Sequence, residues 1–145
     1  MQEGKGFKFL EHTADEYIMA YGASLEEAFE SAALAMFEVM TDTSTVEARK
    51  SENIKVKAED ESTLLYAWLE KLLIRFETKG QLYSKFKVHK IERVEKCFSL
   101  EATVWGENYN LDKHPSRTSI KAVTYYRMEI KREEKIVIVK FILDI

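Results

Sequence analysis

The sequence predicts an α+β domain in which two helices pack on a mostly antiparallel sheet, in the order β-α-β-α-β-β-β-β. In the first half, two stretches carry apolar residues at helical spacing, and each follows a capping residue. After Gly80 the apolar pattern changes to a period of two, which indicates strands. The length of 145 residues suits a single domain spanning 1–145. Segregated helices and strands of this kind are typical of α+β domains.

The chain is expected to open with a strand and a helix. Bulky residues alternate over 17–21 and stop at Gly22, which predicts the strand. Ser24 and Glu27 are spaced as a capping box, in which each side chain satisfies a main-chain N–H of the first helical turn. The apolar stripe that follows predicts a helix ending near Asp42.

A short strand and a second helix come next. Apolar residues alternate with lysines over 54–56, which predicts the strand. Asp60 is the expected N-cap of the helix, and Gly80 is its expected C-cap. The apolar face of this helix consists of Leu65, Trp68, Leu69, Leu72 and Phe76.

Four strands are expected in the second half, at 86–91, 98–104, 120–130 and 136–143. Ile91 falls out of phase in the first of them, which indicates a bulge. The last strand is nearly continuous in apolar residues, so we expect it to be central and buried on both faces. The one long loop covers 106–117.

Composition narrows the class of function. There are 22 basic and 25 acidic residues, a net charge of −3, and nucleic-acid binders usually carry a basic excess. We therefore expect no direct stable binding of nucleic acid, and any work on RNA to run through a protein partner. The single cysteine, Cys97, forms no internal disulfide, which fits a reducing cytoplasm. Neither a signal peptide nor an apolar run of about 18 residues is present, so no membrane association is expected.

Three places hold candidate functional residues. The run 12–15, with His12 and Asp15, is either a turn or part of a site, and spacing alone favours the turn. The end of the chain, 141–145, is apolar except for Asp144. A terminal carboxylate held beside the Asp144 carboxylate would repel it. A hard divalent cation, calcium or magnesium, relieves that repulsion, so this pair of groups favours such an ion. An ordered end facing water without an ion is equally consistent. The run 112–115 is expected to be a solvated loop.

Signatures of common enzymes are missing from the sequence. It contains no glycine-rich phosphate loop, no Gly-x-Ser-x-Gly turn and no His-Glu-x-x-His helix. Cys97 has no evident histidine partner and is expected to be a structural thiol. These observations favour a protein that is not an enzyme.

Several stretches together resemble the archease family over nearly the whole chain. They are EHTAD at 11–15, YG at 21–22, SLEEAF at 24–29, AALAMFEVMTD at 32–42, LLYAWL at 64–69, KAVTY at 121–125 and LDI at 143–145. The resemblance implies a β-α-β-α-β4 fold, which agrees with the pattern of elements. It also implies a protein that activates the GTP-dependent RNA ligase of tRNA splicing, promoting formation of the ligase guanylate and repeated turnover.

The resemblance further implies a divalent-cation site, usually written as calcium. Its ligands would be Asp15, Asp144 and the backbone or terminal oxygens of Ile145. Two residues depart from the family pattern. Tyr126 stands where family members often have histidine, and Glu16 follows Asp15 where a small or aliphatic residue is common. Glu16 either strengthens a cation site or faces solvent, because strand neighbours point to opposite faces.

Two other functions remain open at this point. A chaperone-like modulator of a tRNA cytosine methyltransferase is also compatible with the family. A metal-dependent hydrolase built on His12, Asp15 and Asp144 belongs to a different class. It is disfavoured because no general base or substrate loop is evident beside those residues.

Overall fold

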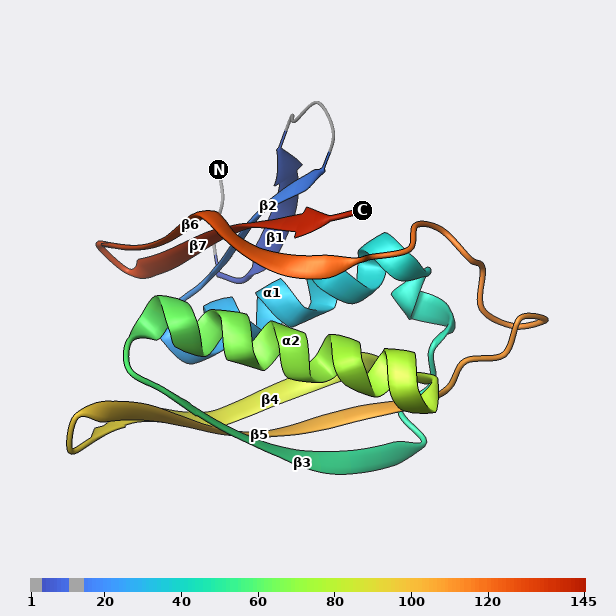
Figure 1. Ribbon diagram of the computed structural model, residues 1–145, viewed down its shortest axis with the longest axis horizontal. Coiled ribbons are helices and arrows are strands. Elements are labelled where there is room, and N and C mark those ends of the chain that lie inside the picture. The colour runs from blue at the N-terminus through green and yellow to red at the C-terminus, as the bar shows by residue number, and fades with distance from the viewer. Residues whose placement is uncertain (1–3, 11–14) are drawn as a thin grey trace.

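The computed structural model describes residues 4–10 and 15–145, and it shows two antiparallel sheets with two helices between them (Figure 1). The four-stranded sheet has the order β1-β2-β7-β6, and the three-stranded sheet has the order β3-β5-β4. The elements are β1 (Gly6–Leu10), β2 (Glu16–Gly22), α1 (Leu25–Met40), the 3₁₀ helix η1 (Thr43–Thr45), β3 (Lys50–Ala58), α2 (Glu61–Lys79), β4 (Gln81–Val94), β5 (Cys97–Asn108), β6 (Ala122–Glu133) and β7 (Ile136–Asp144).

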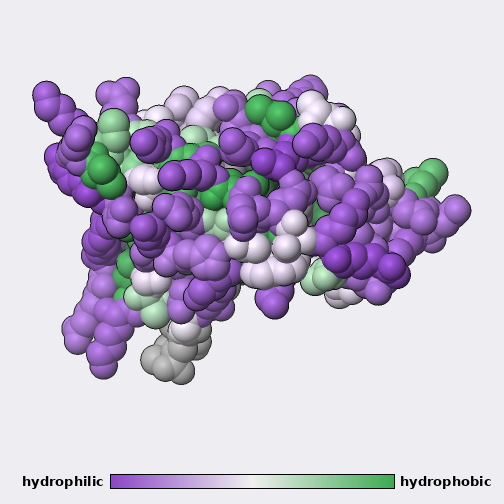
Figure 2. All heavy atoms as spheres, turned by 90° about the horizontal axis from the view of Figure 1, so that it is seen from below, coloured by the Kyte–Doolittle hydropathy of each residue, from purple (hydrophilic) through white to green (hydrophobic). Residues whose placement is uncertain are grey.

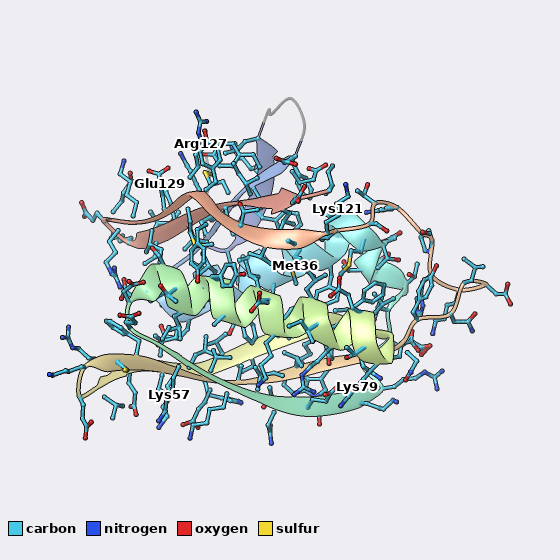
Figure 3. The ribbon with its side chains drawn as sticks, in the orientation of Figure 1. Met36, Lys57, Lys79, Lys121, Arg127 and Glu129 are labelled. Atoms are coloured by element: carbon cyan, nitrogen blue, oxygen red, sulfur yellow. The ribbon has the colours of Figure 1, made fainter. Side chains whose placement is uncertain are left out.

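The predicted class and the order of elements are confirmed, with two differences in detail. The opening segment forms two strands, because β1 pairs with β2 as a hairpin. The strands form two sheets instead of one. The second sheet covers a side of α1 that a single sheet would leave in water: Ala35 and Phe37 are both fully buried, although at about 100° per residue they lie on nearly opposite sides of the helix. Figure 3 shows Met36 in this central layer.

Both helices begin as the sequence predicts. The Ser24 hydroxyl accepts from the Glu27 N–H at 3.1 Å, and the Glu27 carboxylate accepts from the Ala23 N–H at 3.0 Å. In α2 the Asp60 carboxylate accepts from the Thr63 N–H at 2.7 Å. These bonds satisfy N–H groups that have no partner within the helix.

The helix ends differ slightly from expectation. The first helix stops at Met40, before the expected Asp42, because Asp42 instead caps η1 through the Ser44 N–H at 3.0 Å. Gly80 closes α2 in the left-handed conformation, with φ of 67°, as predicted. The bulge in β4 is also present, between Val88 and Lys90, just before the predicted position.

The last strand is central, as predicted, since β7 lies between β2 and β6. The prediction that β7 is buried on both faces was wrong in part. Val139 and Phe141 are fully buried against the helices, whereas Lys140 on the other face is half-buried. The reason is that, among the described residues, neither a helix nor another sheet covers the outer face of this sheet (Figure 1).

The outer face of the three-stranded sheet is largely polar (Figure 2). Its exposed residues alternate with the buried ones of β3, whose Ile54 faces the helices. Within the described residues, no helix is long and apolar enough to cross a membrane.

Candidate functional site

The ends of β2 and β7 bring two predicted site residues to one edge of the structure. Strand β2 begins at Glu16, which pairs with Leu143 of β7, and β7 ends at Asp144. Asp15 directly precedes Glu16 and Asp144 directly follows Leu143, so the two aspartates flank this pair at the same end of the two strands. Directly opposed residues of an antiparallel pair have Cα atoms about 4.5–5.5 Å apart, so the residues that flank such a pair also lie close together. The two carboxylates therefore belong to one location, although 129 positions separate them in sequence.

Alternation along the strands assigns the face of these carboxylates. Leu143 is fully buried against the helices, so its partner Glu16 points to that side as well. Glu16 lines a shallow groove there with Glu38 and Arg117. Asp144, the next residue of β7, consequently lies on the opposite, outer face. Glu16 therefore points away from the face that carries Asp144.

Lys121 and Ile145 complete this edge. The Lys121 N–H donates to the main-chain carbonyl of Asp144 at 2.7 Å, and the next residue, Ala122, pairs with Asp144. Ile145 packs its half-buried side chain against the core. This fastens the end of β7 to the start of β6, and Figure 3 shows Lys121 at that end of β6.

Ligation of a cation by Asp15, Asp144 and Ile145 stays a prediction. Among the described residues, no three side chains of His, Cys, Asp or Glu are grouped closely enough to hold a metal ion. A site on the two aspartates would therefore need main-chain oxygens, water or residues 11–14. His12 lies outside the described residues.

A wide bulge in β6 lies beside this edge, and the sequence did not reveal it. The pairing of β6 with β7 shifts between Thr124 and Glu129. Tyr125 stacks on Tyr66 of α2, with ring centroids 4.1 Å apart. Tyr126 is 65% exposed. A shift in register depends on pairing with β7, so no local pattern could have indicated it.

Two further residues shape this bulge. Arg127 has a φ of 57°, and its guanidinium lies 5.7 Å from the centre of the Tyr126 ring. Arg127 and Glu129 project from the outer side of the sheet (Figure 3). The Tyr66 hydroxyl donates to Glu70 at 2.7 Å, and this hydrogen bond raises the pKa of Tyr66 to about 12. The bulge thus exposes the Tyr126 ring and the Arg127 guanidinium. The neighbouring Tyr125 rests on Tyr66, whose hydroxyl stays neutral.

The prediction that 112–115 is a solvated loop was wrong for His114, which is fully buried. Its Nδ1 accepts from the Asn110 N–H at 2.9 Å, so its proton lies on Nε2, which donates to Glu107 at 2.9 Å. Lys113 also bonds to Glu107, at 2.8 Å. Hydrogen bonds and ion pairs within a polar cluster therefore fix the conformation of this loop, which is not freely solvated as predicted.

Glu107 is the centre of this cluster. Burial would by itself raise the pKa of Glu107. Hydrogen bonds from Lys113, from the Glu47 N–H and from His114 outweigh that effect and lower the pKa to about 2. Arg49 adds an ion pair at 3.1 Å. The arrangement is structural, because every polar atom of the carboxylate is occupied by a neighbour.

Comparison with known proteins matches this architecture to one family. The model of the Archease protein family (MTH1598/TM1083) matches residues 7–145. The archease of Sulfurisphaera tokodaii is 47% identical over 96% of this chain and 98% of its own length. That of Methanothermobacter thermautotrophicus is 47% identical over 97% and 99%. The chain belongs to the archease family.

Two solved structures are also similar. The solution structure of Methanobacterium thermoautotrophicum protein 1598 superposes with a TM-score of 0.85 at 46% identity, covering 97% of this chain and 99% of that one. The crystal structure from Thermotoga maritima, described as an archease and possible chaperone, gives 0.59 at 19% identity, covering 95% and 96%. The second likeness concerns the fold alone.

Proposed function

We propose that this protein is a non-enzymatic, cytoplasmic activator of the GTP-dependent RNA ligase of tRNA splicing, and that it acts by direct protein contact. The observation that carries the proposal is membership of the archease family over residues 7–145. Activation here means helping the ligase to form its covalent guanylate and to turn over repeatedly. A partner that binds the reactive state of the ligase better than its resting state has this effect.

The contact centres on the edge formed by Asp15 and Asp144. The two carboxylates lie next to the Glu16–Leu143 pair and repel each other. A hard divalent cation offsets that repulsion. The donor set is oxygen only, with the oxygens of Ile145 as the third ligand, so calcium or magnesium fits better than zinc. A bound divalent ion would offset most of the negative charge at this edge. Tyr126 and Arg127 in the nearby bulge extend this surface.

The decisive experiment measures guanylate formation on the purified ligase, with GTP and metal but without RNA. We expect the protein to raise the rate under these conditions, because this step requires only the ligase, the nucleotide and metal. Asp15→Asn and Asp144→Asn should each abolish the increase. Asp112→Asn is the matched control, since its carboxylate is exposed and lies on the distant loop. Stimulation that strictly requires RNA would contradict activation by protein contact.

Binding to RNA alone provides a second test. The net charge of −3 predicts that tRNA does not bind to the isolated protein at micromolar concentration and physiological salt. A filter-binding or anisotropy titration measures this directly. Tight binding of tRNA would replace the contact model with one in which the protein presents RNA to the ligase.

A chaperone-like role toward a tRNA methyltransferase is the second candidate. It is favoured by the description of the Thermotoga maritima structure as a possible chaperone. Purification of the protein from its own cells discriminates between the two, because the ligase or the methyltransferase should be recovered with it. Turnover of generic phosphoesters by the purified protein would instead support a metal-dependent hydrolase.

A further inference from the structure

A cluster of lysines lies on the outer face of the three-stranded sheet, the side of the molecule seen in Figure 2. Alternate side chains of β3, β5 and β4 point to this face, away from the helices. Figure 3 shows Lys57 on that side. The lysines of the face are Lys55, Lys57, Lys85, Lys87 and Lys90. They belong to the sheet that does not carry the aspartate edge.

Two glutamates of the same face neutralise part of this charge. Glu101, on the central strand β5, has its carboxylate 4.0 Å from the Lys55 ammonium and 3.7 Å from the Lys90 ammonium. The Glu92 carboxylate lies 3.6 Å from the same Lys90 ammonium. Five lysines against two glutamates still leave the face positive, although the net charge of the chain is −3. Positive charge is therefore concentrated here in a chain that is acidic as a whole.

Three of the lysines are available to a partner. Lys57, Lys85 and Lys87 are exposed, and none of them forms an ion pair with a residue that the structure describes. The Lys85 ammonium lies 4.6 Å from the centre of the half-buried Trp105 ring and covers it. The face consequently offers exposed cations on both of its outer strands, and its described residues include no open Phe, Tyr or Trp ring.

Hydrogen bonds across the three strands order the middle of this face. The Thr103 hydroxyl of β5 donates to Asn53 Oδ1 of β3 at 3.1 Å. The same hydroxyl lies 2.8 Å from Nε2 of His89 in β4, so this ring nitrogen donates to it. Since neighbouring strands are about 4.8 Å apart, the lysines of β3 and those of β4 form two rows about 10 Å apart. Neutral polar groups thus form a preordered floor between two rows of cations.

The composition of the face selects the chemistry of its partner. Interfaces between proteins are depleted in lysine and enriched in aromatic side chains and arginine. Phosphate groups, by contrast, are bound by lysine as a point charge, with hydroxyl and amide side chains as further donors. We propose that this face contacts the phosphate backbone of an RNA strand. Base stacking requires an open ring, and phosphate contacts carry no sequence information, so the contact is independent of sequence. That the strand is RNA rests on the proposed function.

Lysines on β3 and β4 have one other physical explanation. Both strands lie at the edges of the sheet, where lysine deters pairing with strands of other chains. That role requires charge only, and it predicts no binding that depends on these side chains. Salt-dependent binding of RNA separates the two explanations.

The number of unpaired lysines limits the affinity. Binding to a single strand weakens with salt by a logarithmic slope of about −0.7 for each phosphate contacted. Three contacts give a slope of about −2, which weakens binding about 20-fold between about 50 and 200 mM salt. The isolated protein therefore binds RNA measurably at low salt only, in agreement with the lack of tRNA binding expected at physiological salt. Inside a complex that already holds RNA, the high effective concentration compensates for this weak affinity.

Fluorescence anisotropy of a labelled dodecauridylate measures this binding. We expect binding at about 50 mM salt that weakens about 20-fold by about 200 mM. Dodecaadenylate should bind with an affinity within about threefold, because phosphates carry no sequence information. A lack of binding at low salt, or an affinity that does not change with salt, would overturn the proposal. The ligase takes no part in this assay, so failure here is separate from failure of the proposed function.

A pair of double variants tests the lysines themselves. Lys57→Gln with Lys87→Gln should reduce the slope to about −0.7 and weaken binding at low salt more than about tenfold. The matched control is Lys8→Gln with Lys140→Gln, because these two lysines flank Met19 in one row of the other sheet. The control should leave the slope and the affinity unchanged, and neither double variant should lower the melting temperature noticeably. Equal losses of affinity in the two double variants would refute the assignment to this face.

Competition with an acidic peptide tests the class of partner. Dodecaglutamate should displace the RNA less well at the same concentration of charge, because each of its carboxylates sits on a flexible side chain that must be ordered on binding. Equal displacement would assign the face to an acidic protein surface and overturn the proposal.

Discussion

Replacing Trp68 by alanine is the most direct test of the central helical layer. The indole is fully buried in the core, and its Nε1–H donates to the Phe29 carbonyl of α1 at 2.9 Å. It also meets Phe86 of the three-stranded sheet edge-on, with centroids 6.5 Å apart. One side chain thus joins α2 to the other helix and to a sheet, so its loss affects three elements together.

The magnitude follows from burial and from the hydrogen bond. Truncating a fully buried tryptophan to alanine costs about 3–5 kcal/mol, because contacts are lost and a cavity remains. The hydrogen bond from Nε1 accounts for about 1 kcal/mol of this. Against a total stability of about 5–15 kcal/mol, such a loss leaves a marginal fold. A decrease of 4 kcal/mol corresponds to a fall in melting temperature of about 10–15 °C for a chain of this size.

Urea unfolding followed by far-UV circular dichroism measures this change. Trp105→Ala is the matched control, because Trp105 is half-buried on the outer face of β5 and meets the Lys85 ammonium at 4.6 Å. The control should lose about 1 kcal/mol or less. If both variants lost the same free energy of unfolding, or if Trp68→Ala lost less than about 1 kcal/mol, the reasoning from burial would be refuted.

Three further predictions concern a close backbone contact, the loop cluster and the aspartate edge. Gly106→Ala should strongly destabilise the fold, since an added Cβ would lie 1.7 Å from the Leu82 carbonyl oxygen, and thermal melting measures the loss. Glu107 has a pKa of about 2, below its ordinary 4.5, so the stability it contributes is present above about pH 4.5 and lost as the pH falls toward 2. Glu107→Gln should accordingly be less stable than the natural protein at pH 6, and urea titrations should show the difference shrinking between pH 5 and 2. Asp15→Asn and Asp144→Asn should each change the free energy of unfolding by no more than about 0.5 kcal/mol, measured in the same way, because both lie outside the core.

Each of these three predictions has a control variant or a result that would contradict it. Gly80→Ala should cost only about 1 kcal/mol, because nothing lies within 4 Å of its added Cβ and only the positive φ is strained. A pH-independent difference for Glu107→Gln would mean that the lowered pKa is not the source of stability. Destabilisation of Asp15→Asn as large as that of Trp68→Ala would make the aspartate edge structural.

Local sequence patterns predicted the elements well because they report interactions within a few residues. Ser24, Asp60 and Gly80 mark helix ends through bonds made inside one turn, and all three occupy the predicted caps. The resemblance to the archease family likewise depended on short runs of sequence, and the family match over 7–145 confirms it.

The sequence by itself therefore determined the class of fold, the element order, the helix caps and the family, since each depends on local periodicity or local composition. Only the tertiary structure decided that the helices lie between two sheets, that Glu16 points to the helix side of its sheet, and that His114 is buried. These features depend on strand register and on contacts between distant segments. Burial of an individual side chain is set by whichever layer covers it, and no window of neighbouring residues contains that information.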